Sequence, residues 1–339
     1  MEGSESKIRI VESDDPARNK INQDETIKKY AEALIPYDIS LIGHGKGFLN
    51  STSTMCYHNS LMQCLLSLPS IYKVISKTKY EHFLTNTLRR LWEVYYNFTE
   101  SKANELDELN KKLWQTVIEI SKQRADLKRF DSGQQDANEG LLLFLSVIEK
   151  SVPDLYILFE HMYSHIIYCV DCQTQKTVKK KGTIIHVKQS FKSNQHPMFA
   201  SFKQPNSLNE YIINHDSYIE GYTCEKCKSK KAKFSINLIQ GLPEILPILF
   251  EKYHDKSETK FPEELAFNSI NPGKKLIYRL VAQCEHSGTQ SGGHYWAIAQ
   301  RSNGVINLND SRITPSVFTP TINTYMIFYH YVGERIAKK

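Results

Sequence analysis

The sequence contains no run of about 18 consecutive apolar residues, which is the length that a membrane-spanning helix requires. Its N-terminus, MEGSESKIRIVESDD, also lacks the basic stretch followed by an apolar stretch that marks a secretory signal. We therefore expect an intracellular protein, located in the cytoplasm or also in the nucleus, that does not associate with membranes.

Glycine and proline are few, at 15 and 12 of 339 residues, and the chain has no low-complexity segment. Hydrophobic residues make up 40% and charged residues 24%, which is the composition of an ordinary globular protein. These proportions exclude a collagen, a coiled-coil rod and a fully disordered chain. A disulfide miniprotein is excluded because a chain of this length buries a hydrophobic core without needing disulfide crosslinks. The formal net charge of +6 is too small to indicate nucleic-acid binding by itself.

The hydrophobic pattern changes its period along the chain. Apolar residues recur at helical spacing in four segments of the first half, namely about 56–68, 83–96, 106–120 and 136–149. From about residue 163 short alternating runs replace them, which is typical of strands separated by turns. Helices followed by strands predict an α+β fold rather than a doubly wound sheet. Residues 1–40, charged and poor in aromatics, are predicted to form a mobile tail.

Four of the seven cysteines form two Cys-x-x-Cys pairs, Cys169 with Cys172 and Cys224 with Cys227. Each pair follows or precedes a strand-like run, as in a zinc ribbon, and together they supply the four thiolates of a tetrahedral zinc site. A closed four-thiolate shell leaves no open position, so we predict a structural Zn²⁺ with no part in catalysis. Reduced, buried cysteines without a metal are the less favoured interpretation.

Lysine runs flank both cysteine pairs and carry the alternative of a nucleic-acid-binding finger. They are Lys179–Lys181 before the second pair and Lys228, Lys230, Lys231 and Lys233 after it. A solvated charged face explains them more simply, so nucleic acid is the disfavoured partner.

Among the other three cysteines, Cys56 is the candidate nucleophile. Cys64 falls on the apolar face of the predicted helix and Cys284 ends a strand-like run, so both are interpreted as packing residues. Cys56 instead follows a loop of small residues and begins a helix. The amides and dipole of a helix N-terminus favour the thiolate, which is the reactive form of cysteine.

A nucleophilic thiolate needs a base and a group that orients the base. His294 follows two glycines at the start of a predicted strand and is the candidate base. Asn309 and Asp310 lie at the end of the next strand, and either could hold the imidazole through its other nitrogen, as in Cys-His-Asn triads. The residues alone therefore predict a cysteine hydrolase with a structural zinc. They do not identify its substrate.

Four blocks of the sequence, in the same order, resemble the catalytic domain of the ubiquitin-specific proteases. They are Gly47–Asn50 with Cys56–Ser60 and Gln63; Gln134–Glu139; the Cys-x-x-Cys pairs with ILPILFEKY; and His286–Gly288 with Gly293–Tyr295, Asn309–Ser311 and Tyr325–Tyr329. The resemblance covers about residues 45–332.

The resemblance implies a papain-like cysteine protease fold shaped like a hand, with a catalytic domain over 41–335. Its helical thumb would span about 41–160, its zinc-ribbon β fingers about 161–250 and its β palm about 251–335. Ubiquitin, the implied partner, would rest on the fingers of a monomeric enzyme. Its C-terminal tail would run to Cys56 past Gln135, Asp136, Glu139, Gly293 and Tyr295. Asp136 is equally well interpreted as the N-cap of a helix.

The resemblance also implies deubiquitinating activity, with hydrolysis after the C-terminal glycine of ubiquitin. The family usually places an asparagine five positions before the nucleophile, where this chain has Ser51, while Asn50 lies six positions before it. Either residue is a candidate for the oxyanion hole. This departure supports an alternative, in which the same fold is a weak or inactive ubiquitin-binding scaffold.

Overall fold

The structure is a computed structural model. It describes residues 34, 36–79, 83–123, 130, 133–188, 207–218, 222–230, 232–240, 242–251, 260–289 and 292–337. The predicted tail over 1–40 lies outside these residues except for 34 and 36–40, and so does Lys231 of the second lysine run.

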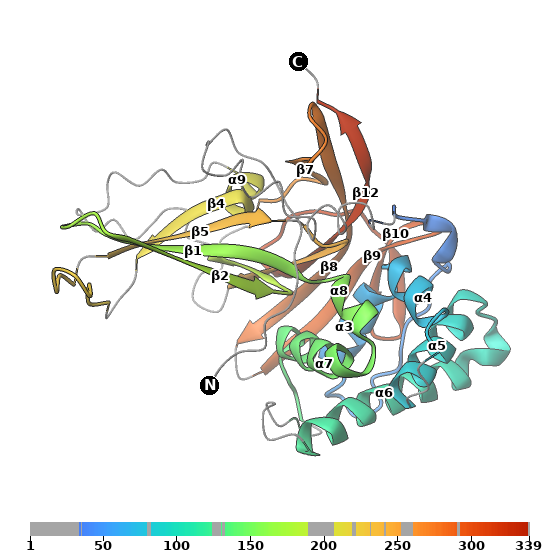
Figure 1. Cartoon of the computed structure of the whole chain (residues 1–339). Coiled ribbons are helices and arrows are strands. Elements are labelled where there is room, and N and C mark those ends of the chain that lie inside the picture. The colour runs from blue at the N-terminus through green and yellow to red at the C-terminus, as the bar shows by residue number, and fades with distance from the viewer. Residues whose placement is uncertain are drawn as a thin grey trace.

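Helices form one layer of the structure (Figure 1). They are α3 (Cys56–Leu65), α4 (Pro69–Ile75), α5 (Phe83–Tyr96), α6 (Ala103–Gln123), α7 (Ala137–Ser151) and α8 (Pro153–Ile157), with short 3-10 turns η2 (Ile39–Leu41) and η3 (Glu100–Lys102). Every residue of α3 is buried, because this helix lies between the other helices and strand β9. The remaining helix, α9 (Leu208–Ile213), lies among the strands.

Strands form two sheets. The four-stranded sheet has the order β2-β1-β5-β4 and contains β1 (His161–Cys169), β2 (Gln175–Gly182), β4 (Asn214–Tyr218) and β5 (Ala232–Gln240). The eight-stranded sheet has the order β11-β10-β9-β8-β12-β6-β3, with β7 also paired to β8. Its strands are β3 (Ile185–Lys188), β6 (Ile245–Glu251), β7 (Glu264–Asn268), β8 (Lys274–Thr289), β9 (Gly292–Arg301), β10 (Gly304–Asn309), β11 (Arg312–Pro315) and β12 (Thr324–Ile336). The four-stranded sheet projects away from the helices in Figure 1.

The central strands of the larger sheet, among them β8, β12 and β6, are buried on both faces. Because side chains alternate along a strand, Met326 and Phe328 of β12 join the large core shared with the helices. Ile327 and Tyr329 of the same strand join a second core with α9 on the other face. β8, the neighbour of β9 in this sheet, is therefore packed from two sides.

The α+β prediction is confirmed, and so are the four predicted helical segments. The first segment is interrupted, since α3 ends at Leu65 and Pro69 opens α4, where its missing N–H costs nothing. The strand β2 has mostly polar, exposed residues and gave no apolar alternation to read. No helix of the described part is long and apolar enough to cross a membrane.

Candidate active site

The structure places Cys56 as the first residue of α3, as its sequence context predicts. The side chain is 1% exposed, and the preceding loop, Asn50–Met55, leads the chain into the helix. Gly47 lets this loop pack on the β10–β11 turn, because a Cβ at Gly47 would lie 2.3 Å from the carbonyl oxygen of Asp310. The amide of Phe48 donates to that same carbonyl at 3.0 Å.

His294 lies near the start of β9, and its imidazole is a hydrogen-bond partner of the Cys56 thiol. Its Nε2 lies 2.7 Å from Oδ1 of Asn309, the last residue of β10. Three elements distant in sequence thus bring a thiol, an imidazole and an amide into one line. This arrangement leaves Nδ1 to face the sulfur.

The two ionisable groups of this line shift each other's pKa values. Burial raises the pKa of the Cys56 thiol, but hydrogen bonds from His294 and the Tyr295 amide, with the positive charge of His294, lower it overall. The hydrogen bond with Cys56 raises the pKa of His294 to about 9, against a lowering effect of burial and with help from Asn309. Both shifts favour a thiolate–imidazolium pair, which is the nucleophilic form.

Asp310 lies in the β10–β11 turn, with a φ of 49°, and its carboxylate points away from the imidazole toward two asparagines. It accepts from Nδ2 of Asn59 at 2.8 Å and from Nδ2 of Asn50 at 3.1 Å. Of the two candidates to orient His294, the hydrogen bond is made by Asn309. Asp310 contributes through its negative charge, which helps to raise the pKa of His294.

The two oxyanion-hole candidates are held within the loop. Oδ1 of Asn50 accepts from the Met55 amide at 3.0 Å, while its Nδ2 is directed at Asp310. The hydroxyl of Ser51 lies 3.9 Å from the sulfur of Met55. None of these described hydrogen bonds reaches Cys56.

A cavity of about 380 Å³ leads toward the site between the start of α7 and the β8–β9 strands. Its lining includes the predicted tail-binding residues, which are Gln135, Asp136, Glu139, Gly293 and Tyr295. Three further carboxylate or imidazole groups, His186, Glu251 and His286, line it, and the described residues of its lining include no lysine or arginine. The cavity therefore offers an anionic surface to a ligand.

Asp136 is the N-cap of α7, accepting from the amides of Asn138 and Glu139 at 2.8 and 3.1 Å. Its other carboxylate oxygen accepts from the hydroxyls of Tyr325 and Tyr295, at 2.5 and 3.3 Å. Both oxygens thus serve to hold the start of α7 against β9 and β12. The capping interpretation of Asp136 is confirmed by these contacts.

Gln134 was not among the residues predicted for the site. Its Nε2 donates toward Sγ of Cys56 at 3.8 Å and to the carbonyl oxygen of Gly293, while its Oε1 accepts from the Gly293 amide at 3.2 Å. The signal that could have found it is its position at the head of the Gln134–Glu139 block, just before the Asp136 cap.

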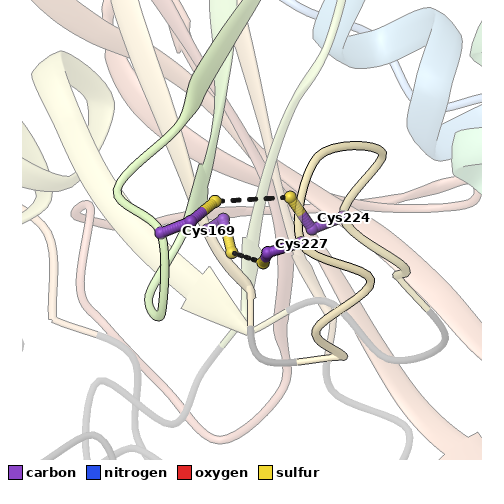
Figure 2. A group of neighbouring side chains, drawn as sticks. Cys169, Cys224 and Cys227 are labelled. Atoms are coloured by element: carbon purple, nitrogen blue, oxygen red, sulfur yellow. Dashed lines mark hydrogen bonds between the residues drawn. The ribbon is translucent and has the colours of Figure 1, made fainter.

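The four cysteines of the Cys-x-x-Cys pairs form one cluster (Figure 2). All four sulfurs lie within 4.8 Å of one another. The two pairs also repeat one backbone pattern. The residue after each pair, Gln173 or Lys228, has a φ near +60° and donates its amide to the carbonyl of the first cysteine. Such matched turns aim two sulfurs at a common centre.

The chemistry of this donor set fits zinc. The backbone amide of Ser229 lowers the pKa of Cys227, but desolvation and the three neighbouring sulfurs raise it to about 12. Hydrogen bonds from Thr174 lower the pKa of Cys172 to about 6. Four thiolates this close repel one another, so a divalent cation is what would let all four ionise together. Cys169, Cys172, Cys224 and Cys227 are the residues that would hold it.

Comparisons with curated proteins find distant relatives that share one description. "Ubiquitin carboxyl-terminal hydrolase 26" of Oryza sativa subsp. japonica is 24% identical over 76% of this chain and 24% of its own length. "Ubiquitin carboxyl-terminal hydrolase 2" of Gallus gallus is 32% identical over 32% of this chain and 34% of its own length. The chain thus spans about a quarter to a third of the length of the curated relatives it matches.

Solved structures show the same fold at low sequence identity. The SAGA DUB module Ubp8/Sgf11/Sus1/Sgf73 bound to monoubiquitin aligns with a TM-score of 0.63 and 19% identity, over 96% of this chain and 77% of that one. The same module bound to ubiquitin aldehyde aligns with a TM-score of 0.62 and 18% identity, with the same coverage. Residues 46–329 match the family described as ubiquitin carboxyl-terminal hydrolase, and the chain therefore belongs to that family.

Proposed function

We propose that this protein is a deubiquitinating cysteine protease, which hydrolyses the isopeptide, peptide or thioester bond after the C-terminal glycine of ubiquitin. The observation that carries the proposal is the contact of Cys56 with His294, backed by Asn309 at 2.7 Å, next to an anionic cavity whose lining residue Gln134 reaches Cys56. The family, and solved neighbours whose titles name bound ubiquitin, support the substrate.

The reaction begins with the proton of Cys56 on His294. The thiolate attacks the carbonyl carbon of the last glycine, and a tetrahedral oxyanion forms. When the carbon–nitrogen bond breaks, the leaving amine takes the proton from His294 and a thioester remains. Water then gives a proton to His294 and attacks the thioester, so that the thiolate leaves and free ubiquitin is released. Asn309 keeps the imidazole in place throughout.

The oxyanion needs preorganised N–H donors, and losing one costs on the order of 10²–10³ in rate. The first amides of a helix point away from its own carbonyls, and those of α3 are proposed to supply such donors beside Cys56. The side-chain donor is proposed to come from the Asn50–Met55 loop, through Asn50 or Ser51.

The anionic cavity is proposed to hold the basic tail of ubiquitin on its way to Cys56. Glu139 is partly exposed in the cavity lining and suits a charge-assisted contact with an arginine. Asp136 contributes to the electrostatic field but holds α7 with its hydrogen bonds. The zinc site is proposed to be structural and to keep the four-stranded sheet in shape for the body of ubiquitin.

A second candidate is a ubiquitin-binding scaffold with weak or absent catalysis. The observation that favours it is the position of Asn50, whose amide nitrogen is directed at Asp310 rather than at the nucleophile. The scaffold would bind ubiquitin through the same surfaces without forming the thioester.

An electrophilic ubiquitin probe, with a reactive group in place of the last carboxylate, separates the two candidates. The enzyme forms a covalent adduct that disappears in Cys56→Ala, and it cleaves a fluorogenic ubiquitin amide. Cys64→Ala is the matched control, because Cys64 is a second buried cysteine of α3, and this variant keeps the adduct. Ubiquitin binding without an adduct would establish the scaffold and refute the protease.

A further inference from the structure

The start of β9 presents an open strand edge beside the nucleophile. β8 pairs with β9 from Gly292 to Ala299, whereas β10 pairs with β9 only over residues 297–301. Residues 292–296 therefore have a strand on one side and none of β10 on the other. The amide of Tyr295 is a hydrogen-bond donor to Cys56 and the backbone of Gly293 faces Gln134. Residues two apart share one edge of a strand, so this edge faces the thiol.

The side chain of Gln134 fills that edge at Gly293. A primary amide carries N–H donors and an acceptor oxygen in the geometry of a peptide group, and Gln134 uses both kinds. Its Nε2 donates to the Gly293 carbonyl, and its Oε1 accepts from the Gly293 amide at 3.2 Å. This is the pair of bonds that an added β-strand would make with the same residue. The same Nε2 lies 3.8 Å from the sulfur, in the place where a scissile peptide must pass.

We propose that Gln134 is a placeholder that caps the substrate-binding edge of β9, and that an extended peptide ending in glycine must displace it to reach Cys56. This inference rests on the proposed protease function and deepens it. In the free protein the side-chain amide satisfies Gly293 and closes the end of the cavity. In the complex the backbone of the substrate takes over both hydrogen bonds, and the Gln134 side chain turns out toward solvent.

The geometry around Gly293 explains why the strand has a glycine at this position. A Cβ at Gly293 would lie 2.4 Å from Nε2 of His286 and 2.5 Å from the Ser287 carbonyl, so the strand itself is packed without room. The glycine therefore keeps β9 close to β8, and its backbone amide and carbonyl stay directed at Gln134 on the other edge.

Steady-state kinetics of Gln134→Ala on a fluorogenic ubiquitin amide test the proposal. Removing a competing pair of solvent-accessible hydrogen bonds is expected to raise kcat/KM by about two- to tenfold. The increase in kcat/KM is expected to come from a lower KM, with kcat unchanged. The reason is that the Gln134 amide competes with substrate binding and not with the chemical step. Gln134→Asn, whose amide is too short to reach Gly293, is expected to behave in the same way. Gln115→Ala, an exposed glutamine on α6, is the matched control.

Alkylation of Cys56 by iodoacetamide gives the reference rate, since this reagent does not use the β9 edge. Gln134 helps to lower the pKa of Cys56, so both variants are expected to alkylate no faster than the wild-type protein. The ratio of ubiquitin turnover to alkylation must therefore rise. An unchanged or lower kcat/KM in Gln134→Ala, while wild type cleaves the substrate, overturns the placeholder alone. Failure of both proteins to turn over substrate defeats the proposed function as well.

Discussion

At the scale of single residues, the neighbours Asn309 and Asp310 make different contacts in the site. The turn that joins β10 to β11 contains only Asp310 and Ser311, and this sharp reversal sends the two neighbouring side chains in different directions. Asn309 reaches His294, whereas Asp310 binds Asn59 and Asn50 and fixes the loop that precedes Cys56. Asn309 therefore holds the candidate base, and Asp310 holds the loop that leads to the candidate nucleophile.

The titration of His294 is expected to depend on the sulfur more than on Asn309. Because the hydrogen bond with Cys56 is the largest cause of its raised pKa, an NMR titration should place His294 near 9 in the wild-type protein. Cys56→Ala should move the pKa down toward the ordinary histidine value of 6.5, and Asn309→Ala should move it by less. Cys64→Ala should leave it in place. A value that is the same with and without Cys56 would contradict the ion pair.

The raised pKa of His294 determines how both the stability and the activity of the protein change with pH. Since the pKa of His294 is raised on folding, its contribution to stability is complete below pH 6.5 and is lost as pH rises through about 9. Activity should fall over the same alkaline range, because the imidazolium that protonates the leaving amine is then depleted.

Much of this site could be read from the sequence, but not the direction of each side chain. Cys56 at a helix start and His294 at a strand start follow from local patterns. The choice between Asn309 and Asp310 required the turn geometry, which the residue types do not specify. Gln134 was missed for a related reason, since a polar loop residue gives no sign of which backbone it will meet across 159 positions of chain.

At the scale of elements, a buried arginine joins the helix that begins with Cys56 to the strand that carries His294. Arg301, the last residue of β9, is 0% exposed. Its guanidinium donates to the carbonyl and side-chain oxygens of Gln63 on α3, to Ser67 Oγ and to the hydroxyl of Tyr95 on α5. The carbonyls at the end of α3 lie at the negative end of its dipole, so the cation is well placed there.

Arg301→Lys should therefore be strongly destabilising although it keeps the charge. A lysine offers one ammonium in place of the planar fork and leaves several buried acceptors without donors. We expect the free energy of unfolding to fall by about 3 kcal/mol, measured by urea denaturation at equilibrium.

Arg335→Lys on β12 is the matched control for this substitution. Arg335 is exposed and pairs with Glu264, so the loss there should stay below about 1 kcal/mol. Equal effects of the two substitutions would show that the Arg301 contacts do not join the elements.

At the scale of the whole molecule, the cysteine cluster ties together the far end of the four-stranded sheet. Cys169 ends β1 and Cys172 lies in the β1–β2 turn, while Cys224 and Cys227 lie in the segment before β5. The cluster is therefore a crosslink between two hairpin ends, remote from the layer that holds Cys56 (Figures 1 and 2).

We expect the purified protein to contain one zinc ion per chain, measured by atomic emission, and Cys172→Ser to lose it. Because the metal would crosslink β1 to the segment before β5, its removal should increase hydrogen exchange in β1 and β2 and raise KM for ubiquitin substrates. Alkylation of Cys56 should keep its rate, since the reacting groups belong to the other sheet and the helices.

Cys64→Ser, which removes a thiol outside the cluster, should retain the metal. A zinc-free protein with the same exchange pattern and the same KM would contradict a structural role for the cluster.

The thiol and the imidazole belong to different layers, one to a helix and the other to a sheet, and no covalent segment shorter than 238 positions links them. The reactivity of Cys56 thus depends on the interface between these layers rather than on either layer alone. A ligand or substitution that slides the helices on the sheet by an ångström or so would separate sulfur from ring nitrogen while leaving both layers folded. Such a shift at the interface would abolish the activity without blocking the cavity.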